Sequence, residues 1–334
     1  MKNENLPKIS ILLPVYNAEK YLSDCLKSLF NQTFHDFEII AIDDASTDSS
    51  LNILYKYAEI DSRIKIYSNK SNLKLAATLN KGIQFSSAPL IARMDADDIA
   101  LPNRLEYQYN FMLNNPKVAI CGTNIKVLGT DQIWEMPVSN SEIRATLVFN
   151  SPILHPTVIY RKHTICKYNG YNENIVYAQD YELWHRLSKD REVVFKNINI
   201  PLVYYRLTDS DKPSSYKEIQ KNTADIIRKE QIKMLDIIPD SRQLALHSQI
   251  SLHQDINTLP QLFAAYRWLR LLVASPKSSQ AFKHLCWQYW KQICRSSSCK
   301  YISYPIYLLL PSSDEKMKII QKKFLTYYKG TSNG

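Results

Sequence analysis

Short apolar runs alternate with helical repeats along the first 130 residues of the chain. Four of the runs are continuous and of strand length, as in strands buried on both faces, and they fall at residues 9–13, 37–42, 64–67 and 90–94. Apolar positions recur at helical spacing between and after them, in residues 21–29, 51–58, 75–83 and 102–114. Asn17 is placed to cap the first of these helices. A further strand is expected at 118–128.

Repeated strand–helix alternation predicts an α/β fold with a mainly parallel, wound sheet and helices on both faces. The site of such a sheet lies outside the carboxyl ends of its strands. The rhythm changes after residue 130, with helices expected at 141–149 and 180–188 and strands at 157–160 and 202–206. The chain then reads as helical to its end. We therefore predict three regions, residues 1–130, 131–215 and 216–334.

Charge is distributed unevenly along the 334 residues. Lys and Arg total 42 against 32 Asp and Glu, a net charge of +10. Residues 1–215 hold 24 basic and 24 acidic side chains, which leaves 18 basic and 8 acidic for residues 216–334. A nucleic-acid binder is expected to carry its basic stripe on the folded recognition domain, so we expect no nucleic-acid partner.

Neither end nor middle of the sequence carries a membrane-spanning pattern. No run reaches the 18 apolar residues of a spanning helix, and residues 301–310 are too few. The first residues lack the apolar stretch of a signal peptide. The six cysteines are not spaced as zinc ligands, so we expect free thiols in a reducing cytoplasm.

Two acidic clusters follow predicted strands. Asp43 and Asp44 end the second strand, and Asp95, Asp97 and Asp98 end the fourth. In a wound sheet both clusters meet at one edge, where crowded carboxylates repel each other unless a cation joins them. Oxygen ligands suit Mg²⁺ or Mn²⁺, which usually also bind substrate phosphates. Ordinary turn and cap chemistry explains either cluster alone, but two clusters at corresponding strand ends favour a site.

Several motifs together resemble family 2 glycosyltransferases over roughly residues 7–210. They are Pro14-Val15-Tyr16-Asn17, Asp43-Asp44-Ala45-Ser46-Thr47-Asp48, the segment from Asn72 to Asn80, and Ala92-Arg93-Met94-Asp95-Ala96-Asp97-Asp98 followed by Pro102, Arg104 and Leu105. The resemblance implies a GT-A fold, in which residues 1–130 form the nucleotide-sugar-binding half and 131–215 the acceptor-binding half. Residues 216–334 would be a helical, basic extension.

The resemblance assigns donor and metal roles by position. Pro14, Tyr16 and Glu19 match the loop that borders the nucleoside. Asp44 matches the acid that reads uracil, with Asp43 beside it. Asp95 and Asp97 match the D-x-D pair, near the ribose and on the metal, and Asp98 is a further candidate ligand. Arg93 is placed to approach the nucleotide or to balance these acids.

The segment Tyr177 to Trp184 resembles the family's E-D-x-x-L-W helix start. Asp180 matches the general base of an inverting transfer, although without the resemblance we would favour a helix cap. Gln179 replaces the commoner Glu on the acceptor side, and Glu182 is expected to be solvated. Trp184 suits either an acceptor-sugar platform or core packing.

His155 belongs to a segment, Ser151 to Thr157, that resembles the acceptor-side H-P-T strand. It suits either a hydrogen bond to acceptor or phosphate, or a structural anchor. Lys74 stands where the family usually has Gly, so we expect a rebuilt loop or a Lys that avoids the strained backbone. No His follows near Thr208, so coordination should rest on aspartates, phosphates and water.

The basic C-terminal region mixes Trp and Tyr with Lys and Arg, which suits an anionic membrane surface. The alternative is a helical appendage that packs on protein. Because a lipid-linked acceptor would lie at the membrane, we expect a cytoplasmic protein that is peripheral on the inner face of the plasma membrane.

The sequence thus predicts an inverting glycosyltransferase of hexosyltransferase type. It would move a sugar from a nucleotide-diphosphate donor, expected to be a UDP-sugar, with Mg²⁺ or Mn²⁺ as cofactor. The acceptor would be a hydroxyl of a glycan or lipid-linked glycan in capsule, lipopolysaccharide or exopolysaccharide assembly. One alternative is a sugar-nucleotide nucleotidyltransferase, which would need a Gly-rich loop that Pro14 to Asn17 lacks. The other is a silent nucleotide-sugar-binding scaffold.

Overall fold

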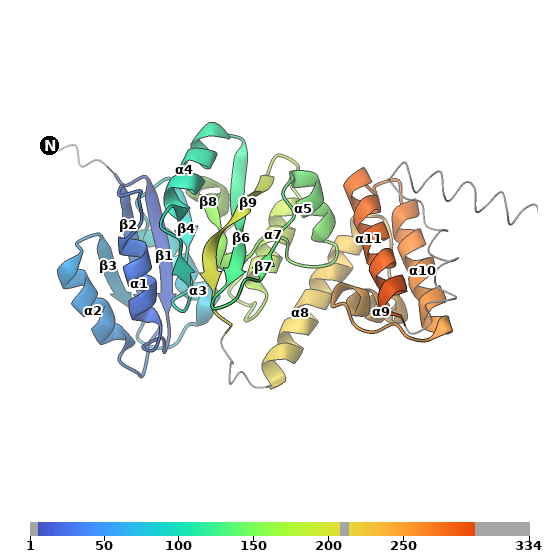
Figure 1. Cartoon of the computed structure of the whole chain (residues 1–334), viewed down its shortest axis with the longest axis horizontal. Coiled ribbons are helices and arrows are strands. Elements are labelled where there is room, and N and C mark those ends of the chain that lie inside the picture. The colour runs from blue at the N-terminus through green and yellow to red at the C-terminus, as the bar shows by residue number, and fades with distance from the viewer. Residues whose placement is uncertain (1–5, 208–213, 298–334) are drawn as a thin grey trace, which may run out of the picture. The chain divides into compact units, whose positions relative to one another are not determined.

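The chain forms two compact units in the computed structural model, which describes residues 6–207 and 214–297 (Figure 1). Of the described residues, those up to 143 and those between 151 and 223 form the first unit, and residues 144–150 and 224–297 form the second. The prediction for Thr208 and the apolar run 301–310 lie outside the described residues. Within the first unit, the division at residue 130 stays a prediction.

One sheet of nine strands runs through the described part of the first unit, in the order β3-β2-β1-β4-β8-β6-β9-β5, with β7 paired to β6 (Figure 1). The strands are β1 (Ile9–Val15), β2 (Phe37–Asp43), β3 (Ile64–Ser68), β4 (Leu90–Arg93), β5 (Ile99–Ala100), β6 (Val118–Val127), β7 (Ile133–Trp134), β8 (Ile159–Arg161) and β9 (Val194–Tyr205). Strands β3, β2, β1 and β4 are parallel, and β8 is antiparallel to both β4 and β6. The prediction of a mainly parallel α/β sheet is confirmed.

Helices cover both faces of this sheet. They are α1 (Leu22–Phe30), α2 (Ser50–Ile60), α3 (Lys74–Phe85), α4 (Arg104–Asn114), α5 (Asn140–Thr146), α6 (Lys162–Lys167) and α7 (Gln179–Ser188). Ile11 and Ile39 share a buried cluster with Leu26 of α1 and Leu54 of α2. Gly82 of α3 packs against Leu12, on the opposite face, because successive strand residues alternate in direction.

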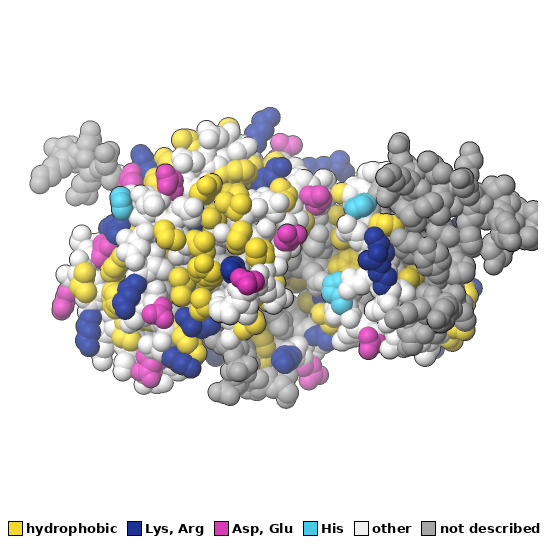
Figure 2. Space-filling model, viewed as in Figure 1, with side chains coloured by type: hydrophobic (Ala, Val, Ile, Leu, Met, Phe, Trp, Pro, Cys, Tyr) yellow, Lys and Arg dark blue, Asp and Glu magenta, His cyan; other side chains and the backbone are white. Residues whose placement is uncertain are grey.

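Local details differ from the sequence-based expectations. Asn17 does not cap α1, whose first turn follows Tyr21 without a side-chain cap. Instead its side-chain oxygen accepts a hydrogen bond from the Thr47 amide at 2.8 Å. Strand β9 begins eight residues before the predicted start at 202, because its first half pairs with β6. Basic and acidic side chains are interspersed on the visible face of this unit, in keeping with its balanced charge (Figure 2).

The second unit is helical, as predicted. Its helices are α8 (Ser214–Lys233), which begins in the first unit, α9 (Ser241–Ser251), α10 (Leu259–Ala274) and α11 (Gln280–Ser296). Asp240 and Thr258 each close a capping box with the Gln three residues later, which fixes where α9 and α10 begin. The core packs Phe149 with Trp268 and Trp290. Among the described residues, no helix combines the length and the apolar character needed to cross a bilayer.

Candidate functional site

Both acidic clusters lie at the same edge of the sheet, as the winding predicts. Strand β1 separates them, with Val15 in register with Asp43 on one side and Leu12 with Arg93 on the other. The Asp44 amide donates to Val15 O at 2.8 Å. Because these strands are parallel, the loops that follow them open on one side, which is where a doubly wound sheet binds its ligand.

Asp44 organises the loop after β3. Its Oδ1 accepts hydrogen bonds from Asn69 Nδ2 at 2.7 Å and from the Leu73 amide at 2.8 Å. Its Oδ2 accepts from the Lys74 amide at 3.0 Å. Lys74 has a φ of +72°, so the loop keeps the left-handed backbone, and the expectation that Lys74 would avoid this conformation is wrong. Two strand ends and the start of α3 are thus joined through one carboxylate.

Asp43 is buried beside Asp44, with one oxygen hydrogen-bonded and one without a protein partner. Its Oδ2 accepts from the Ser46 amide at 3.2 Å, whereas Oδ1 is enclosed and unpaired. A buried acceptor without a donor costs free energy unless a ligand or water supplies one. Asp43 therefore retains hydrogen-bonding capacity for a bound molecule.

The loops after β1 and β2 interlock next to these acids. Glu19 Oε2 accepts from the Ser49 amide at 2.9 Å, and the Glu19 amide donates to Asp48 Oδ2 at 3.0 Å. Pro14 is half-buried and Tyr16 is 51% exposed. The carboxylate of Glu19 is thus engaged in holding the loops, while the Tyr16 ring remains accessible for stacking.

Asp95, Asp97 and Asp98 form the cluster that best suits a cation. One carboxylate oxygen from each lies within 4.8 Å of the others. Asp98 Oδ2 is buried without a partner. Burial, and after it the charge of Asp95, raises the pKa of Asp98 to about 8. Three hard oxygen ligands with an unsatisfied buried oxygen fit Mg²⁺ or Mn²⁺.

Arg93 balances part of this charge. Its buried guanidinium forms a two-bonded ion pair with the Asp95 carboxylate, and its Nε has no partner. Behind it, Arg104 Nη2 donates to Arg93 O at 2.7 Å, and burial lowers the pKa of Arg104 to about 10. Of the two roles expected for Arg93, the charge-balancing one is present in this structure.

Arg206 contacts the same acidic segment and was not singled out from the sequence. Its amide donates to Asp98 Oδ1 at 2.8 Å and its Nε to Asp97 O at 2.9 Å. The guanidinium lies over the Tyr21 ring, 4.5 Å from its centroid. Arg206 directly follows β9, so the end of this strand supports the acidic segment. In the sequence, the one indication of a role for Arg206 is that it lies two residues before Thr208.

Asp180 lies in the first turn of α7, which starts after Ala178 at a φ of +60°. The Ala178 side chain offers no cap, and Asp180 is half-buried with Oδ2 3.2 Å from the Ser151 hydroxyl. Burial raises the pKa of Asp180, while the Tyr181 amide, Ser151 and Arg93 act in the opposite direction. A carboxylate with a raised pKa is suited to take up a proton near neutral pH.

The three predicted acceptor-side residues are all buried. His155 Nε2 lies 2.9 Å from the Tyr171 hydroxyl, and burial holds the pKa of His155 well below its usual value, so its ring is neutral. Trp184 is 0% exposed and meets His155 edge-on, 6.5 Å between ring centroids. Gln179 is 8% exposed. In this structure Trp184 has the packing role rather than a face open to a sugar.

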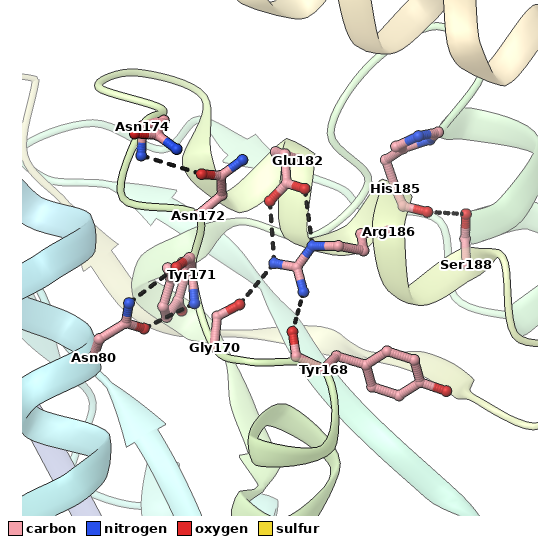
Figure 3. Close-up of polar contacts among 10 residues, drawn as sticks. All are labelled: Asn80, Tyr168, Gly170, Tyr171, Asn172, Asn174, Glu182, His185, Arg186 and Ser188. Atoms are coloured by element: carbon pink, nitrogen blue, oxygen red, sulfur yellow. Dashed lines mark hydrogen bonds and ion pairs between the residues drawn. The ribbon is translucent and has the colours of Figure 1, made fainter.

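The loop after α6, residues 168–174, joins α3 to α7 (Figure 3). Asn80 accepts from the Tyr171 amide at 2.8 Å and donates to Tyr171 O at 2.9 Å. Arg186 donates to Tyr168 O and to Gly170 O, and it pairs with Glu182 at 2.9 Å. Glu182 is therefore held in an ion pair, and the expectation that it is solvated is wrong. The loop fixes Tyr171 next to His155.

Arg93 is where the two halves of the site meet. Its charge acts on the pKa values of Asp98 at the acidic segment, of Asp180 on α7, and of His155 and Tyr171, in each case after burial. Asp95 forms an ion pair with this buried guanidinium, and Asp98 and Asp180 are within range of its charge. Such an arrangement suits a reaction with an anionic leaving group on one side and a proton acceptor on the other.

Comparison with known proteins agrees with this geometry. A family model described as glycosyl transferase family 2 matches residues 10–170. An uncharacterized glycosyltransferase of Haemophilus influenzae is 35% identical over 246 residues, which cover 69% of this chain and 74% of the relative. The chain belongs to glycosyl transferase family 2. It is a glycosyltransferase enzyme, as the sequence predicts.

Other glycosyltransferases are similar over much of the chain. The Escherichia coli O-antigen biosynthesis glycosyltransferase WbnJ is 34% identical, with 63% of this chain and 84% of WbnJ covered. The E. coli UDP-Glc:alpha-D-GlcNAc-diphosphoundecaprenol beta-1,3-glucosyltransferase WfgD is 31% identical, with 64% and 83% covered. The crystal structure of S. aureus TarS 1–349 in complex with UDP-GlcNAc matches with a TM-score of 0.55 at 19% identity, covering 90% of each chain. The chain spans 55% of the longer TarS chain. This likeness confirms the GT-A fold.

Proposed function

We propose that this family 2 enzyme transfers a sugar from a UDP-sugar to an acceptor hydroxyl with inversion at the anomeric carbon. Two observations carry the proposal: the cluster of Asp95, Asp97 and Asp98 with its buried, unpaired oxygen, and the Asp180 carboxylate beside the Ser151 hydroxyl. A displacement with inversion needs a leaving-group site and a base on different sides of the reacting carbon. The TarS structure with UDP-GlcNAc, a protein of the same fold, supports a uridine donor.

The donor would bind at the edge formed by β1, β2 and β4. Asp44 and the spare oxygen of Asp43 would accept hydrogen bonds from the base, and Tyr16 would border the nucleoside. Pro14 shapes this loop, and Glu19 supports it through the Ser49 amide. Arg93 would keep Asp95 in place, close to the ribose.

Asp95, Asp97 and Asp98 would hold Mg²⁺ or Mn²⁺. When bound, the cation would neutralise charge on the departing diphosphate. The residues fit it because Asp98 has a buried, unpaired oxygen and three carboxylates crowd one place. Arg206 would keep the backbone of this segment in position through Asp97 O.

Asp180 would act as the general base. Its carboxylate takes the proton from the acceptor hydroxyl as the hydroxyl oxygen forms a bond to the anomeric carbon. The bond from that carbon to the diphosphate oxygen breaks, and the nucleoside diphosphate leaves with the electron pair. An α-linked donor then gives a β-linked product. His155 is neutral and paired with Tyr171, so it would position the acceptor side rather than carry charge.

The acceptor would be a glycan or lipid-linked glycan of a surface polysaccharide. Two similar proteins support this: WbnJ is named for O-antigen biosynthesis, and WfgD for transfer of glucose to a diphosphoundecaprenol-linked sugar. The WfgD name also combines a UDP-sugar donor with a β-linkage, which agrees with the stereochemistry proposed here.

A lipid-linked acceptor would bring the enzyme to the inner membrane surface, and α10 offers a suitable face. Phe263 is 47% and Leu271 43% exposed, and Arg267 and Arg270 are exposed at helical spacing beside them. Apolar side chains next to arginines suit the boundary of an anionic bilayer. We propose peripheral association through this α10 face.

Incubation of the purified protein with a panel of nucleotide sugars, an acceptor extract and Mn²⁺ or Mg²⁺ tests the proposal. Release of UDP from one donor, with a β-linked product by NMR, is expected, and Asp97→Ala should lose divalent-dependent donor binding. Pyrophosphate formation from UTP and a sugar 1-phosphate would instead indicate a nucleotidyltransferase. Donor binding without any turnover would indicate a scaffold.

A further inference from the structure

The peptide segment 148–150 lies within the chain of the first unit but belongs to the helical second unit. His247 Nε2 donates to Val148 O at 2.8 Å. Phe149 is 0% exposed, and its ring stacks on Tyr289 with 4.3 Å between centroids. Two helices of the second unit, α9 and α11, therefore hold a piece of chain that precedes α7 in the sequence.

Arg228 of α8 makes the central hydrogen bonds to this segment. Its Nε donates to Phe149 O at 2.7 Å and its Nη2 to Asn150 Oδ1 at 2.9 Å. Asn150 Nδ2 in turn donates to Ser251 O at 2.6 Å. Arg228 is 2% exposed, and Asp225 pairs with it at 2.7 Å. A buried guanidinium that bonds two consecutive residues fixes the backbone there in both position and direction.

The next residue, Ser151, is the one whose hydroxyl lies 3.2 Å from Asp180 Oδ2. The same hydroxyl lies 3.3 Å from Ile153 O, and with one proton it can serve only one acceptor at a time. The following residue is also fixed, because Asn197 Nδ2 donates to Pro152 O at 3.0 Å. Ser151 thus stands between two held residues, one peptide bond from Asn150.

We propose that Ser151 is a positioning residue for the Asp180 base, to which its hydroxyl donates a hydrogen bond. This inference rests on the proposed function, in which Asp180 accepts the acceptor proton. The hydroxyl orients the carboxylate and stabilises its charged form.

Other groups besides Ser151 also affect the pKa of Asp180. They are the Arg93 guanidinium from β4, the Tyr171 phenol from the loop after α6, and the Tyr181 amide of α7 itself. None of these is changed by a substitution at Ser151. Loss of the hydroxyl alone should therefore make the Asp180 carboxylate easier to protonate.

The test is the pH profile of kcat/KM for Ser151→Ala, with Ser151→Thr as the conservative rescue. For Ser151→Ala we expect the acid limb to move up by about one pH unit and kcat/KM below it to fall about tenfold, with donor KM unchanged. Ser151→Thr should restore the wild-type profile. A wild-type profile for Ser151→Ala would overturn the positioning role. Asp180→Asn separates this inference from the function: if it keeps full activity, the base assignment itself fails.

Discussion

Asp44 accepts a hydrogen bond from the Lys74 amide at 3.0 Å, and Lys74 holds a φ of +72° where that bond forms. The resemblance described above leads us to expect glycine at this position. A non-glycine residue in the left-handed region carries a strain of about 1–2 kcal/mol. The carboxylate and its contacts to residues 73 and 74 hold the loop in this conformation despite the lysine.

Lys74→Gly should therefore stabilise the protein, since the backbone bond to Asp44 is kept and the strain is removed. We expect a gain of about 0.5–1 kcal/mol in the free energy of unfolding, after the entropy that glycine adds to the unfolded chain. Urea denaturation measures it. Lys70→Gly is the matched control at an exposed lysine without positive φ, and it should not stabilise. A loss of stability in Lys74→Gly would contradict this account of the loop.

Arg206→Ala should weaken divalent-dependent donor binding by about tenfold, because it removes the bond to Asp97 O and the stacking on Tyr21. Isothermal titration with UDP and Mn²⁺ measures the change. Arg191→Ala, at an exposed arginine before β9, serves as the control and should bind normally. Equal affinity of Arg206→Ala and the wild type would show that β9 does not support the acidic segment.

His247 gives the second unit a pH-dependent stability. Its Nε2 donates to Val148 O, its Nδ1 accepts from Trp268 Nε1 at 3.1 Å, and burial lowers its pKa to about 4. The folded-state pKa is below the unfolded value near 6.5, so the stabilisation is complete above that value and is lost as pH falls towards 4.

His247→Gln can keep both hydrogen bonds without titrating. Its free energy of unfolding should therefore fall less than that of the wild type between pH 6.5 and 4, by roughly 2–3 kcal/mol. Chemical denaturation at a series of pH values measures both proteins. Parallel pH dependence of the two would mean that His247 does not titrate as its burial implies.

Arg267→Glu with Arg270→Glu should reduce binding to vesicles that contain phosphatidylglycerol. Each arginine near an anionic surface contributes about 1 kcal/mol, so reversing two should weaken binding more than about tenfold. Vesicle sedimentation at low salt measures it. The control is the double variant Arg242→Glu and Arg295→Glu, which makes the same charge change on α9 and α11. It should bind the vesicles more tightly than the α10 double variant does. If the two double variants bind equally weakly, the α10 face is not the contact.

The sequence predicts the first strands of the sheet well because each is marked by its own short run of apolar residues. The strands at 9–15 and 37–43 begin at the predicted residues, since short buried runs need no distant partner to be recognised. The meeting of the acidic clusters follows from parallel winding alone. The sequence does not predict the first part of strand β9, because the polar segment around Asn197 and Asn199 is stabilised by pairing with β6 and has no strand pattern of its own.

The fine structure of the site depends on contacts that sequence spacing does not encode. Asn17 holds the next loop instead of capping its own helix. The backbone angle of Lys74 follows from Asp44, thirty residues earlier. The sequence assigns no role to Arg206 or to Ser151, and their contacts with Asp97 and Asp180 appear only in the folded structure.

The most direct test of the central claim is transfer by Asp180→Asn at saturating UDP-sugar, with donor affinity measured by titration calorimetry on the same sample. Asparagine keeps the shape of the side chain but cannot take up the acceptor proton. The account predicts wild-type donor affinity with transfer reduced at least about a hundredfold, the lower range for loss of a general base. Transfer at the wild-type rate by Asp180→Asn, with donor bound normally, would contradict it.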